Sequence, residues 1–390
     1  NNLGHLLHEE SRFGEAMACY REALRLNPRY AEGHNNLGNA LIEAGRPEEA
    51  VRHLRQALQI RPRWAEARNN LGNAYLRLAF LEEATTSYRE ALALDPGCLA
   101  AHSALLHCLN CDPKATPEAV FAEHRRWAER HALPLAGAIL PHPNEPEPER
   151  RLRLGYLSPD FRSHSVASFF APVLAAHDRS KFEIYCYSKT VRPDAVTRRL
   201  AVLADLWRDI CRLPDESAAG LIRQDRIDIL VDLAGYTAGH GLSVMARKPA
   251  PVQVTWLGYP NTTGVETIDY RITDAAADPP FQTEHLHSEE LVRLPGCFLC
   301  YQPPEEAPEV GEVPARHNGF VTFGSFNGLL KVTAPALAAW AAILRRTPGA
   351  RLVLKSHPLA HTKARERVLG ALLAGGVGPE RVELLGAAPG

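Results

Sequence analysis

The feature that most constrains this chain is a 34-residue repeat in its first third. The string NNLG begins at residues 1, 35 and 69. Four further columns recur at the same spacing: Ala16, Ala50 and Ala84; Tyr20, Leu54 and Tyr88; Ala23, Ala57 and Ala91; and Pro28, Pro62 and Pro96. Small residues let two helices approach closely, and a proline stops a helix. We therefore expect helical hairpins stacked into an α-helical solenoid over residues 1–116.

This period and these columns match the tetratricopeptide pattern. Stacked units of this kind share a continuous core and curve into a groove. The second asparagine of each pair, at Asn2, Asn36 and Asn70, forms a column. Because an amide both donates and accepts hydrogen bonds, an exposed column could hold a peptide backbone without reading its side chains. We interpret these residues as binding a protein or peptide acceptor in the groove. The alternative is that they cap helices within their own repeats.

A helical linker is expected over residues 117–150. An amphipathic helix begins at Pro117 and runs to about His131, with Val120 and Trp127 on its apolar side. The proline-rich stretch PHPNEPEP at residues 141–148 then breaks the pattern. We place a domain boundary at this break.

From residue 151 onward, strand-like and helix-like runs alternate, which predicts a parallel sheet with helices on both faces. In the string GYLSPDFRSH, residues 155–164, a strand gives way through a polar loop to an apolar helix at 168–174. Open α/β sheets place their sites in such loops. Asp160 and His164 lie there, and a histidine near a carboxylate can serve proton transfer or bind a polar ligand group. The alternative is a helix cap beside a surface histidine.

Two later strands, at residues 227–233 and 252–257, end in small polar loops. These loops are AGYTAGHG at 234–241 and GYPNTTG at 258–264. Because the carboxyl ends of parallel strands face one crevice, we expect both loops to converge near Asp160 and His164. Tyr236 and Thr237 would supply hydroxyls there, although each loop could also be an ordinary turn. Neither loop is a dinucleotide fingerprint or a P-loop.

A second α/β unit is expected after a proline-rich break around residues 305–318. It starts at Phe320, and the loop from Gly328 to Lys331 leads into a helix at 335–346. A lysine just before a helix N-terminus favours phosphate, although a single lysine is more often simply solvated. We assign residues 151–315 to a first lobe and 316–390 to a second lobe that is too short to be complete.

Composition excludes several function classes. The formal net charge of −1 offers no field for nucleic acid or an anionic membrane, and no apolar run approaches the length of a membrane span. The pairs Cys108/Cys111 and Cys297/Cys300 lie too far apart for a zinc ribbon. We expect no metal site, buried free thiols and a cytoplasmic protein.

Three strings carry a resemblance that spans essentially the whole chain. They are GYLSPDFRSH at 155–164, RKPAPVQVTWLGYP at 247–260 followed by TTG at 262–264, and GSFN at 324–327 with Lys331. Together with the repeats, they resemble the O-GlcNAc transferase and SPINDLY family of GT-B glycosyltransferases, and the short repeat array resembles a bacterial member. The implied fold is a tetratricopeptide solenoid followed by Rossmann-like GT-B lobes.

The resemblance implies inverting transfer of N-acetylglucosamine from UDP-GlcNAc to Ser or Thr hydroxyls of proteins, without a metal or other cofactor. By motif, His164 matches a histidine that contacts the transferred sugar and was once proposed as the base. Asp160 matches another proposed base, and Lys331 matches the lysine that neutralises the departing diphosphate. The residues that match the nucleotide-sugar side of the site are Tyr236, Thr237, Leu257, Gly258 and Gly328.

The sequence departs from the family pattern at three places. Ser165-Val166 follows His164, as in SPINDLY proteins, and plant SPINDLY uses GDP-fucose; a protein O-fucosyltransferase is therefore the alternative. Gly241 stands where the family often has an arginine. The sequence ends before the family's His-Thr-Thr stretch and its ribose-binding carboxylate. A repeat scaffold with an inactive transferase domain is a further alternative, which the presence of Asp160, His164 and Lys331 argues against.

Overall fold

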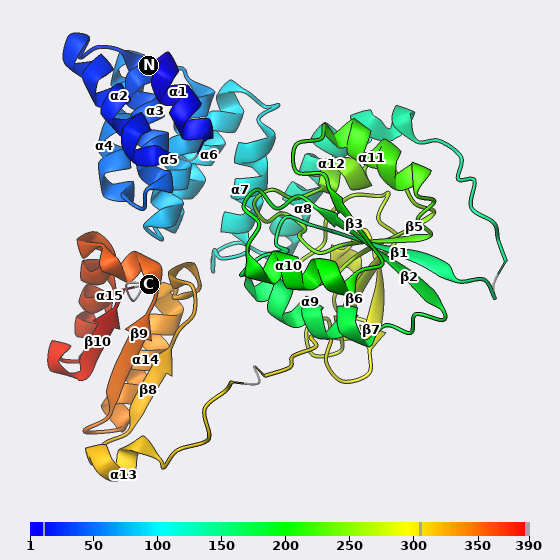
Figure 1. Ribbon diagram of the computed structural model, residues 1–390. Coiled ribbons are helices and arrows are strands. Elements are labelled where there is room, and N and C mark those ends of the chain that lie inside the picture. Colours follow the sequence, from blue (N-terminus) through cyan, green and yellow to red (C-terminus); the bar gives the residue numbers. More distant parts are fainter. Residues whose placement is uncertain (11, 148, 304–305, 387–390) are drawn as a thin grey trace. The chain divides into compact units, whose positions relative to one another are not determined.

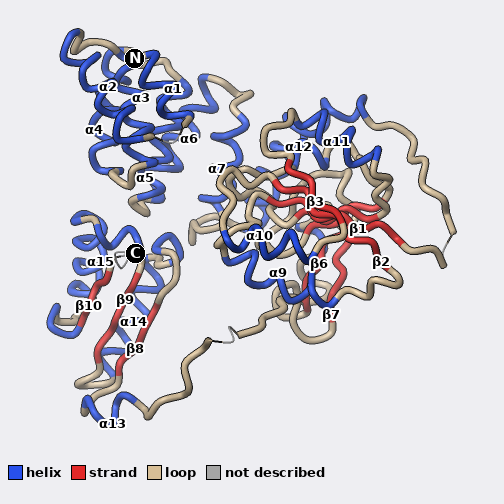
Figure 2. Tube along the Cα trace, viewed as in Figure 1, coloured by secondary structure: helices blue, strands red, loops and turns tan. Residues whose placement is uncertain are grey.

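The computed structural model describes residues 1–390 except 11, 148, 304–305 and 387–390, and it divides into two compact units (Figure 1). The first unit joins Asn1–Ala115 with Pro308–Gly390, and the second is Thr116–Ala307. Figure 2 shows helices alone in the repeat region, and strands both in the second unit and in the C-terminal part of the first.

The repeat region of the first unit is the expected helical solenoid. Its helices are α1 (Asn2–Glu9), α2 (Phe13–Leu26), α3 (Ala31–Glu43), α4 (Pro47–Ile60), α5 (Ala65–Arg77), α6 (Leu81–Leu94) and α7 (Leu99–Leu109). The glycine of each NNLG string faces the large residue of the next helix. A Cβ at Gly72 would lie 2.5 Å from the ring of Tyr88, and a Cβ at Gly38 would lie 2.6 Å from Leu54. The repeat columns therefore record helix-to-helix packing, as the sequence predicted.

The C-terminal part of the first unit is a small parallel sheet covered by helices. Its strands are β8 (Thr322–Ser325), β9 (Arg351–Lys355) and β10 (Val382–Leu385), in the order β10-β9-β8. Its helices are α13 (Pro314–Asn318), α14 (Ala334–Arg346) and α15 (Thr362–Ala374). Its short helical turns are Leu329–Lys331, His357–Ala360 and Pro379–Arg381. Leu337, Leu354 and Val368 belong to its core, and Ala79 from the repeat region belongs to the same core.

The second unit is built on one parallel sheet with the order β3-β2-β1-β4-β5-β6-β7. The strands are β1 (Leu152–Ser158), β2 (Phe182–Ser188), β3 (Leu206–Asp209), β4 (Ile229–Asp232), β5 (Val252–Thr255), β6 (Tyr270–Asp274) and β7 (Glu290–Leu294). β1 pairs with β2 on one side and with β4 on the other. The chain order therefore reverses between β1 and β4, which makes this pair the topological switch point of the sheet.

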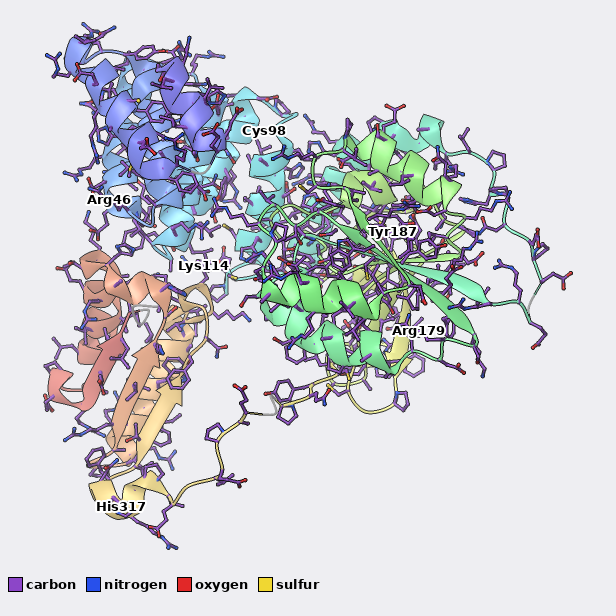
Figure 3. The ribbon with its side chains drawn as sticks, viewed as in Figure 1. Arg46, Cys98, Lys114, Arg179, Tyr187 and His317 are labelled. Carbon is purple, nitrogen blue, oxygen red and sulfur yellow. The ribbon has the colours of Figure 1, made fainter. Side chains whose placement is uncertain are left out.

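Helices cover both faces of this sheet. α9 (Ser165–Ala176) and α10 (Ala195–Leu203) lie on one face, and α11 (Asp215–Gln224) and α12 (Leu242–Met245) lie on the opposite face (Figure 1). Phe161, Phe170 and Ile184 are fully buried in the core beneath α9. Arg179, labelled in Figure 3, joins the ends of α9 and α10 by donating to the carbonyl oxygens of Leu174 and Leu203.

The segment expected as a linker lies in the second unit. α8 (Pro117–Trp127) continues into a π-helical turn at Ala128–Ala132 and a 3-10 turn at Leu133–Ala138, close to the predicted helix end near His131. Trp127 is fully buried, and its ring meets the ring of Tyr236 edge-on at 4.9 Å between centroids. This segment therefore packs on the loop that follows β4.

The predicted alternation of strands and helices is confirmed, and three strands were missed. β3 and β7 lie at the two edges of the sheet, and β7 alternates between exposed and half-buried residues. β6 lies between β5 and β7, and a short 3-10 turn at Glu284–Leu286 precedes β7. None of the described helices is long and apolar enough to cross a membrane.

Candidate active site

The loop after β1 and the loop after β4 leave the sheet side by side at its switch point. Gly239 lies against Pro159, because a Cβ at Gly239 would be 3.2 Å from the Cβ of Pro159. A Cβ at Gly241 would lie 2.5 Å from a methyl carbon of Leu157, which leaves no space for a larger side chain in this packing. The structure therefore brings the post-β4 loop to the strand end that carries Asp160, as the sequence predicted.

Asp160 is a buried carboxyl group with one unpartnered oxygen. The residue is 4% exposed. Its Oδ1 lies 3.6 Å from Nη2 of Arg162 and 3.7 Å from Nδ1 of His164. Its Oδ2 is buried without a hydrogen-bond partner among the described residues. Burial raises the pKa of Asp160, and the charges of His164 and Arg162 oppose this shift. A carboxylate in this position is a stronger base than an exposed aspartate.

His164 is placed by the start of α9. It is the N-cap residue, and its Nδ1 accepts a hydrogen bond of 3.3 Å from the backbone N–H of Val166. A neutral imidazole that accepts at Nδ1 carries its hydrogen on Nε2. The side chain is 32% exposed. In this arrangement neutral His164 presents an N–H donor, and its remaining lone pair is already engaged.

The loop after β4 is held by a buried aspartate at the strand end. The carboxylate of Asp232 accepts hydrogen bonds from the N–H groups of Ala234 and Gly235 and from the hydroxyl of Thr255 on β5. Burial raises the pKa of Asp232 to about 6, and these hydrogen bonds oppose the shift. Asp232 therefore links the ends of β4 and β5.

Tyr236 and Thr237 use their hydroxyls within the protein. Tyr236 is 3% exposed and donates to the carbonyl oxygen of Thr263, which joins the post-β4 loop to the post-β5 loop. Thr237 donates to the carbonyl oxygen of Ala234 at 3.0 Å and is half-buried. Tyr236 therefore connects the post-β4 loop to the post-β5 loop through its hydroxyl group. Its role toward a nucleotide sugar stays a prediction, as does that of Thr237.

At Leu257 and Gly258 the backbone after β5 packs closely against the backbone after β4. Leu257 has a φ of +80°, a left-handed conformation that is rare outside glycine. A Cβ at Gly258 would lie 2.1 Å from the carbonyl oxygen of Leu233, a backbone atom that cannot rotate away. The chain leaving β5 therefore runs directly against the end of β4.

A buried polar network that sequence reasoning missed supports the post-β5 loop from beneath. Glu289 is 4% exposed and accepts hydrogen bonds from the hydroxyls of Thr262 and Thr263 and from the N–H of Thr263. Arg271 donates to the carbonyl oxygens of Tyr259 and Asn261. The sequence did offer a signal for this network, since Arg271 lies inside the missed strand β6 and Glu289 directly precedes the missed strand β7.

His124 of α8 supports the same loop from its other side. It is fully buried, its Nδ1 lies 2.7 Å from the carbonyl oxygen of Val120, and its Nε2 lies 2.9 Å from the hydroxyl of Tyr259. A carbonyl only accepts, so Nδ1 carries the hydrogen and Nε2 accepts from Tyr259. Burial lowers the pKa of His124 to about 4. This residue was not predicted, since its partner lies 135 positions away.

Lys331 and Gly328 belong to the first unit. Both are exposed; Lys331 ends the turn Leu329–Lys331, and α14 starts at Ala334. The pKa of His107, at the end of α7, is lowered by burial and further by the charge of Lys331. The expected position of Lys331 before a helix is thus confirmed, and its role toward a diphosphate stays a prediction.

The asparagine column joins one repeat to the next. Asn70 donates from Nδ2 to Oδ1 of Asn35 at 3.0 Å, and Asn36 donates to Oδ1 of Asn1 at 3.2 Å. Asn70 is 8% exposed, whereas Asn36 is half-buried and Asn2 is exposed. These contacts run between repeats, which neither sequence interpretation specified. Their role toward an acceptor stays a prediction.

The cysteines are all free thiols, and the expectation that they are buried is confirmed only for Cys108 and Cys186, since four others, Cys19, Cys98, Cys111 and Cys211, are half-buried. Cys108 and Cys186 are buried, whereas Cys297 and Cys300 are exposed because they lie in the loop after β7 and not in a strand. Among the described residues, no three His, Cys, Asp or Glu side chains gather in a way that could hold a metal ion.

Comparison with known proteins gives a consistent set of similarities. The model of glycosyl transferase family 41 matches residues 100–302, and tetratricopeptide repeat models match residues 4–45, 38–78 and 65–98. A solved structure of a Thermobaculum terrenum O-GlcNAc transferase mutant superposes with a TM-score of 0.91 at 39% identity, covering 99% of this chain and 73% of that one.

Curated relatives in plants are similar over the same region. The SPINDLY protein of Solanum lycopersicum, named a probable UDP-N-acetylglucosamine–peptide N-acetylglucosaminyltransferase, is 46% identical over 281 residues. The SPINDLY protein of Arabidopsis thaliana, with the same name, is 48% identical over 270 residues. These alignments cover 71% and 68% of this chain. The chain spans only 30% and 29% of the length of these two relatives.

Proposed function

The chain belongs to glycosyl transferase family 41, and on this premise we propose that it transfers N-acetylglucosamine from UDP-GlcNAc to Ser or Thr hydroxyls of proteins, with inversion at the anomeric carbon. The observation that carries this proposal is the buried Asp160 beside His164 at the switch point of the sheet. The names of the plant relatives and of the bacterial structure support the sugar and the protein acceptor.

The chemistry assigned to these residues is a single displacement. The acceptor oxygen forms a bond to the anomeric carbon while the bond from that carbon to the phosphate oxygen breaks, and the acceptor proton passes to a base. We assign the base to Asp160, directly or through a water, because burial makes its carboxylate more basic and its Oδ2 is uncommitted. His164, with Nδ1 engaged, donates from Nε2 to a sugar or acceptor oxygen.

Lys331 is assigned to the departing nucleotide diphosphate. Leaving-group departure develops negative charge, and a fixed cation there lowers the barrier by several kcal/mol. Lys331 is an exposed ammonium just before α14, where helix N–H groups also favour an anion. We further propose that transfer needs no divalent metal ion, which full activity in EDTA would support and rescue by Mn²⁺ or Mg²⁺ would refute.

A GDP-fucose-dependent O-fucosyltransferase is the second candidate. The observation that favours it is the SPINDLY-like Ser165-Val166 pair after His164, at the start of α9. Isothermal titration with UDP and with GDP, followed by mass spectrometry of acceptor peptides incubated with each nucleotide sugar, separates the two. A mass increase from UDP-GlcNAc supports the leading proposal, and binding of neither nucleotide would favour an inactive scaffold.

A further inference from the structure

A hollow of about 280 Å³ lies beside His164 at the start of α9. Arg162 and His164 line it from the β1–α9 loop, Ser165 and Ser168 line it from α9, and Arg199 lines it from α10. Two loops that approach one another form its wall, since the N–H of Ser163 donates to the carboxylate of Asp194 at 2.7 Å. The hollow therefore adjoins the proposed site of transfer, and part of its lining comes from α10, a helix that the proposed mechanism does not use.

The charges facing this hollow are mainly positive. Arg199 is exposed and has no hydrogen bond or ion pair in the part of the chain that the structure describes. Arg162 is 43% exposed, and its nearest acidic oxygen is Oδ1 of Asp160 at 3.6 Å, beyond normal hydrogen-bond length. The nearby Asp194 is committed to capping α10 and to Ser163. The guanidinium groups of Arg162 and Arg199 therefore have N–H donors without a hydrogen-bond acceptor among the described residues.

Unfilled guanidinium donors beside hydroxyls form a site for a carboxylate. Arginine binds carboxylates through paired N–H groups, and the hydroxyls of Ser165 and Ser168 add further donors. The proposed function assigns the nucleotide diphosphate to Lys331, which does not line this hollow, so we assign the anion of this hollow to the acceptor.

Resting on that proposed function, we propose that the hollow lined by Arg162 and Arg199 binds an Asp or Glu side chain of the acceptor near the hydroxyl that is modified. The chain therefore selects acidic acceptor segments. Because the two guanidinium groups are partly solvated, their contribution is modest and decreases with salt.

A matched pair of peptides tests this proposal. One carries a Ser flanked by Asp and Glu, and the other carries Asn and Gln at the same positions. For the wild-type protein we expect kcat/KM to favour the acidic peptide about fivefold, and this preference to shrink in 0.5 M salt. In the Arg199→Gln variant the ratio between the two peptides should fall toward one. Arg198→Gln is the control, since Arg198 is exposed on the same helix but does not line the hollow.

Three outcomes would overturn the proposal: equal kcat/KM for the two peptides, equal loss in the Arg198 and Arg199 variants, or a raised KM for the nucleotide sugar in its acceptor-free hydrolysis by Arg199→Gln. The last outcome would assign the anion to the nucleotide sugar. Fluorescence anisotropy of the labelled peptides, measured without nucleotide sugar, reports the same preference independently of turnover. If transfer and nucleotide binding were both absent, the proposed function would fail. Anisotropy would still show whether the hollow binds acidic peptides.

Discussion

Burial acts on Asp160 and His124 in opposite directions, because in each case it favours the uncharged form. It raises the pKa of the Asp160 carboxyl and lowers the pKa of the His124 imidazole to about 4. The uncharged His124 fits its hydrogen bonds, since only a neutral ring can accept from Tyr259 while it donates to Val120. Oδ2 of Asp160 has no hydrogen-bond partner within the described part of the chain, which suits a group that must take up a proton.

We predict that Asp160→Asn lowers transfer by about 10²-fold or more, the usual contribution of a general base. In the wild-type protein kcat/KM should fall as the pH is lowered. The inflection should lie above about pH 4, the pKa of an ordinary aspartate, because a carboxylate with a raised pKa is protonated at a higher pH. Nucleotide binding by calorimetry is the control and should be retained. An Asn variant with unchanged turnover would remove Asp160 from the mechanism.

Replacement of His124 by Phe should destabilise the protein by about 1–3 kcal/mol, because the buried Tyr259 hydroxyl loses its hydrogen bond to His124. The folded-state pKa of about 4 lies below the ordinary value of 6.5, so the unfolded chain binds the additional proton between these values. Stability contributed by neutral His124 is therefore present above about pH 6.5 and decreases as the pH falls.

Urea unfolding at pH 7 and pH 5 measures this effect. Because the pKa of His124 is lowered to about 4, the free energy of unfolding of the wild type, relative to His124→Phe, should be smaller by about 2 kcal/mol at pH 5 than at pH 7. Tyr259→Phe is the matched variant, since it removes only the hydroxyl from the same hydrogen bond. A difference between wild type and His124→Phe that does not change with pH would show that His124 is not held neutral.

At the scale of elements, glycines mark where two segments come into contact. Gly258 follows β5 and lies against the carbonyl oxygen of Leu233 at the end of β4, and Gly72 of α5 lies against Tyr88 of α6. A Cβ added at Gly220 in α11 would meet nothing within 4 Å. Composition alone does not separate these cases, since each glycine is a weak helix or strand former.

We predict opposite effects for Gly258→Ala and Gly220→Ala. A methyl group at Gly258 meets a backbone atom at 2.1 Å, so the β4 and β5 loops must separate, and we expect a loss of more than about 2 kcal/mol. Gly220→Ala meets nothing within 4 Å and should stabilise α11 by about 0.5–1 kcal/mol. Thermal melting of both variants checks this, and equal melting temperatures would contradict the geometry.

The asparagine column yields a prediction for the repeat helices. Replacing Asn36 and Asn70 by Ala removes the side-chain hydrogen bonds that these two residues donate to the preceding repeat. It also leaves Oδ1 of the buried Asn35 without Asn70, so the melting temperature should fall. Asn39→Ala on α3 is the control, since Asn39 is half-buried outside this column. If protein glycosylation fell while melting and nucleotide-sugar hydrolysis stayed at wild-type values, the acceptor role would be supported instead.

How far the sequence predicts these elements depends on the range of the contact. The helical repeats and the buried strands β1, β4 and β5 were predictable, because a 34-residue period and a run of apolar residues can be read from the local sequence. The edge strand β7 was not, since its alternating exposure weakens the apolar signal. The loop after β4 was placed correctly beside the end of β1 by parallel topology, whereas Glu289 and His124 were missed because their partners are distant in sequence.

At the scale of the whole molecule, the chain leaves the first unit after Ala115, builds the second unit, and returns to the first at Pro308. The first unit therefore depends on contacts between sequence-distant parts. Ala79, after α5, is 1% exposed within the core that contains Leu337 and Val368. Arg367 of α15 donates to the carbonyl oxygen of Ala79 at 2.7 Å, and its guanidinium lies 5.9 Å from the centre of the Phe80 ring.

We predict that Arg367→Ala weakens the coupling between the repeat helices and the C-terminal sheet. The variant loses a charge-assisted hydrogen bond and a cation–π contact on a partly solvated surface, worth together about 1–2 kcal/mol. Arg365→Ala is the matched control two positions away, since Arg365 donates to the carbonyl oxygens of Leu359 and Leu384, both within the C-terminal part. Hydrogen exchange distinguishes the two variants: Arg367→Ala should raise exchange in α6 of the repeats as well as in α15, whereas Arg365→Ala should raise it in α15 and β10 alone. Equal exchange in α6 for both variants would show that the repeats fold without help from the C-terminal sheet.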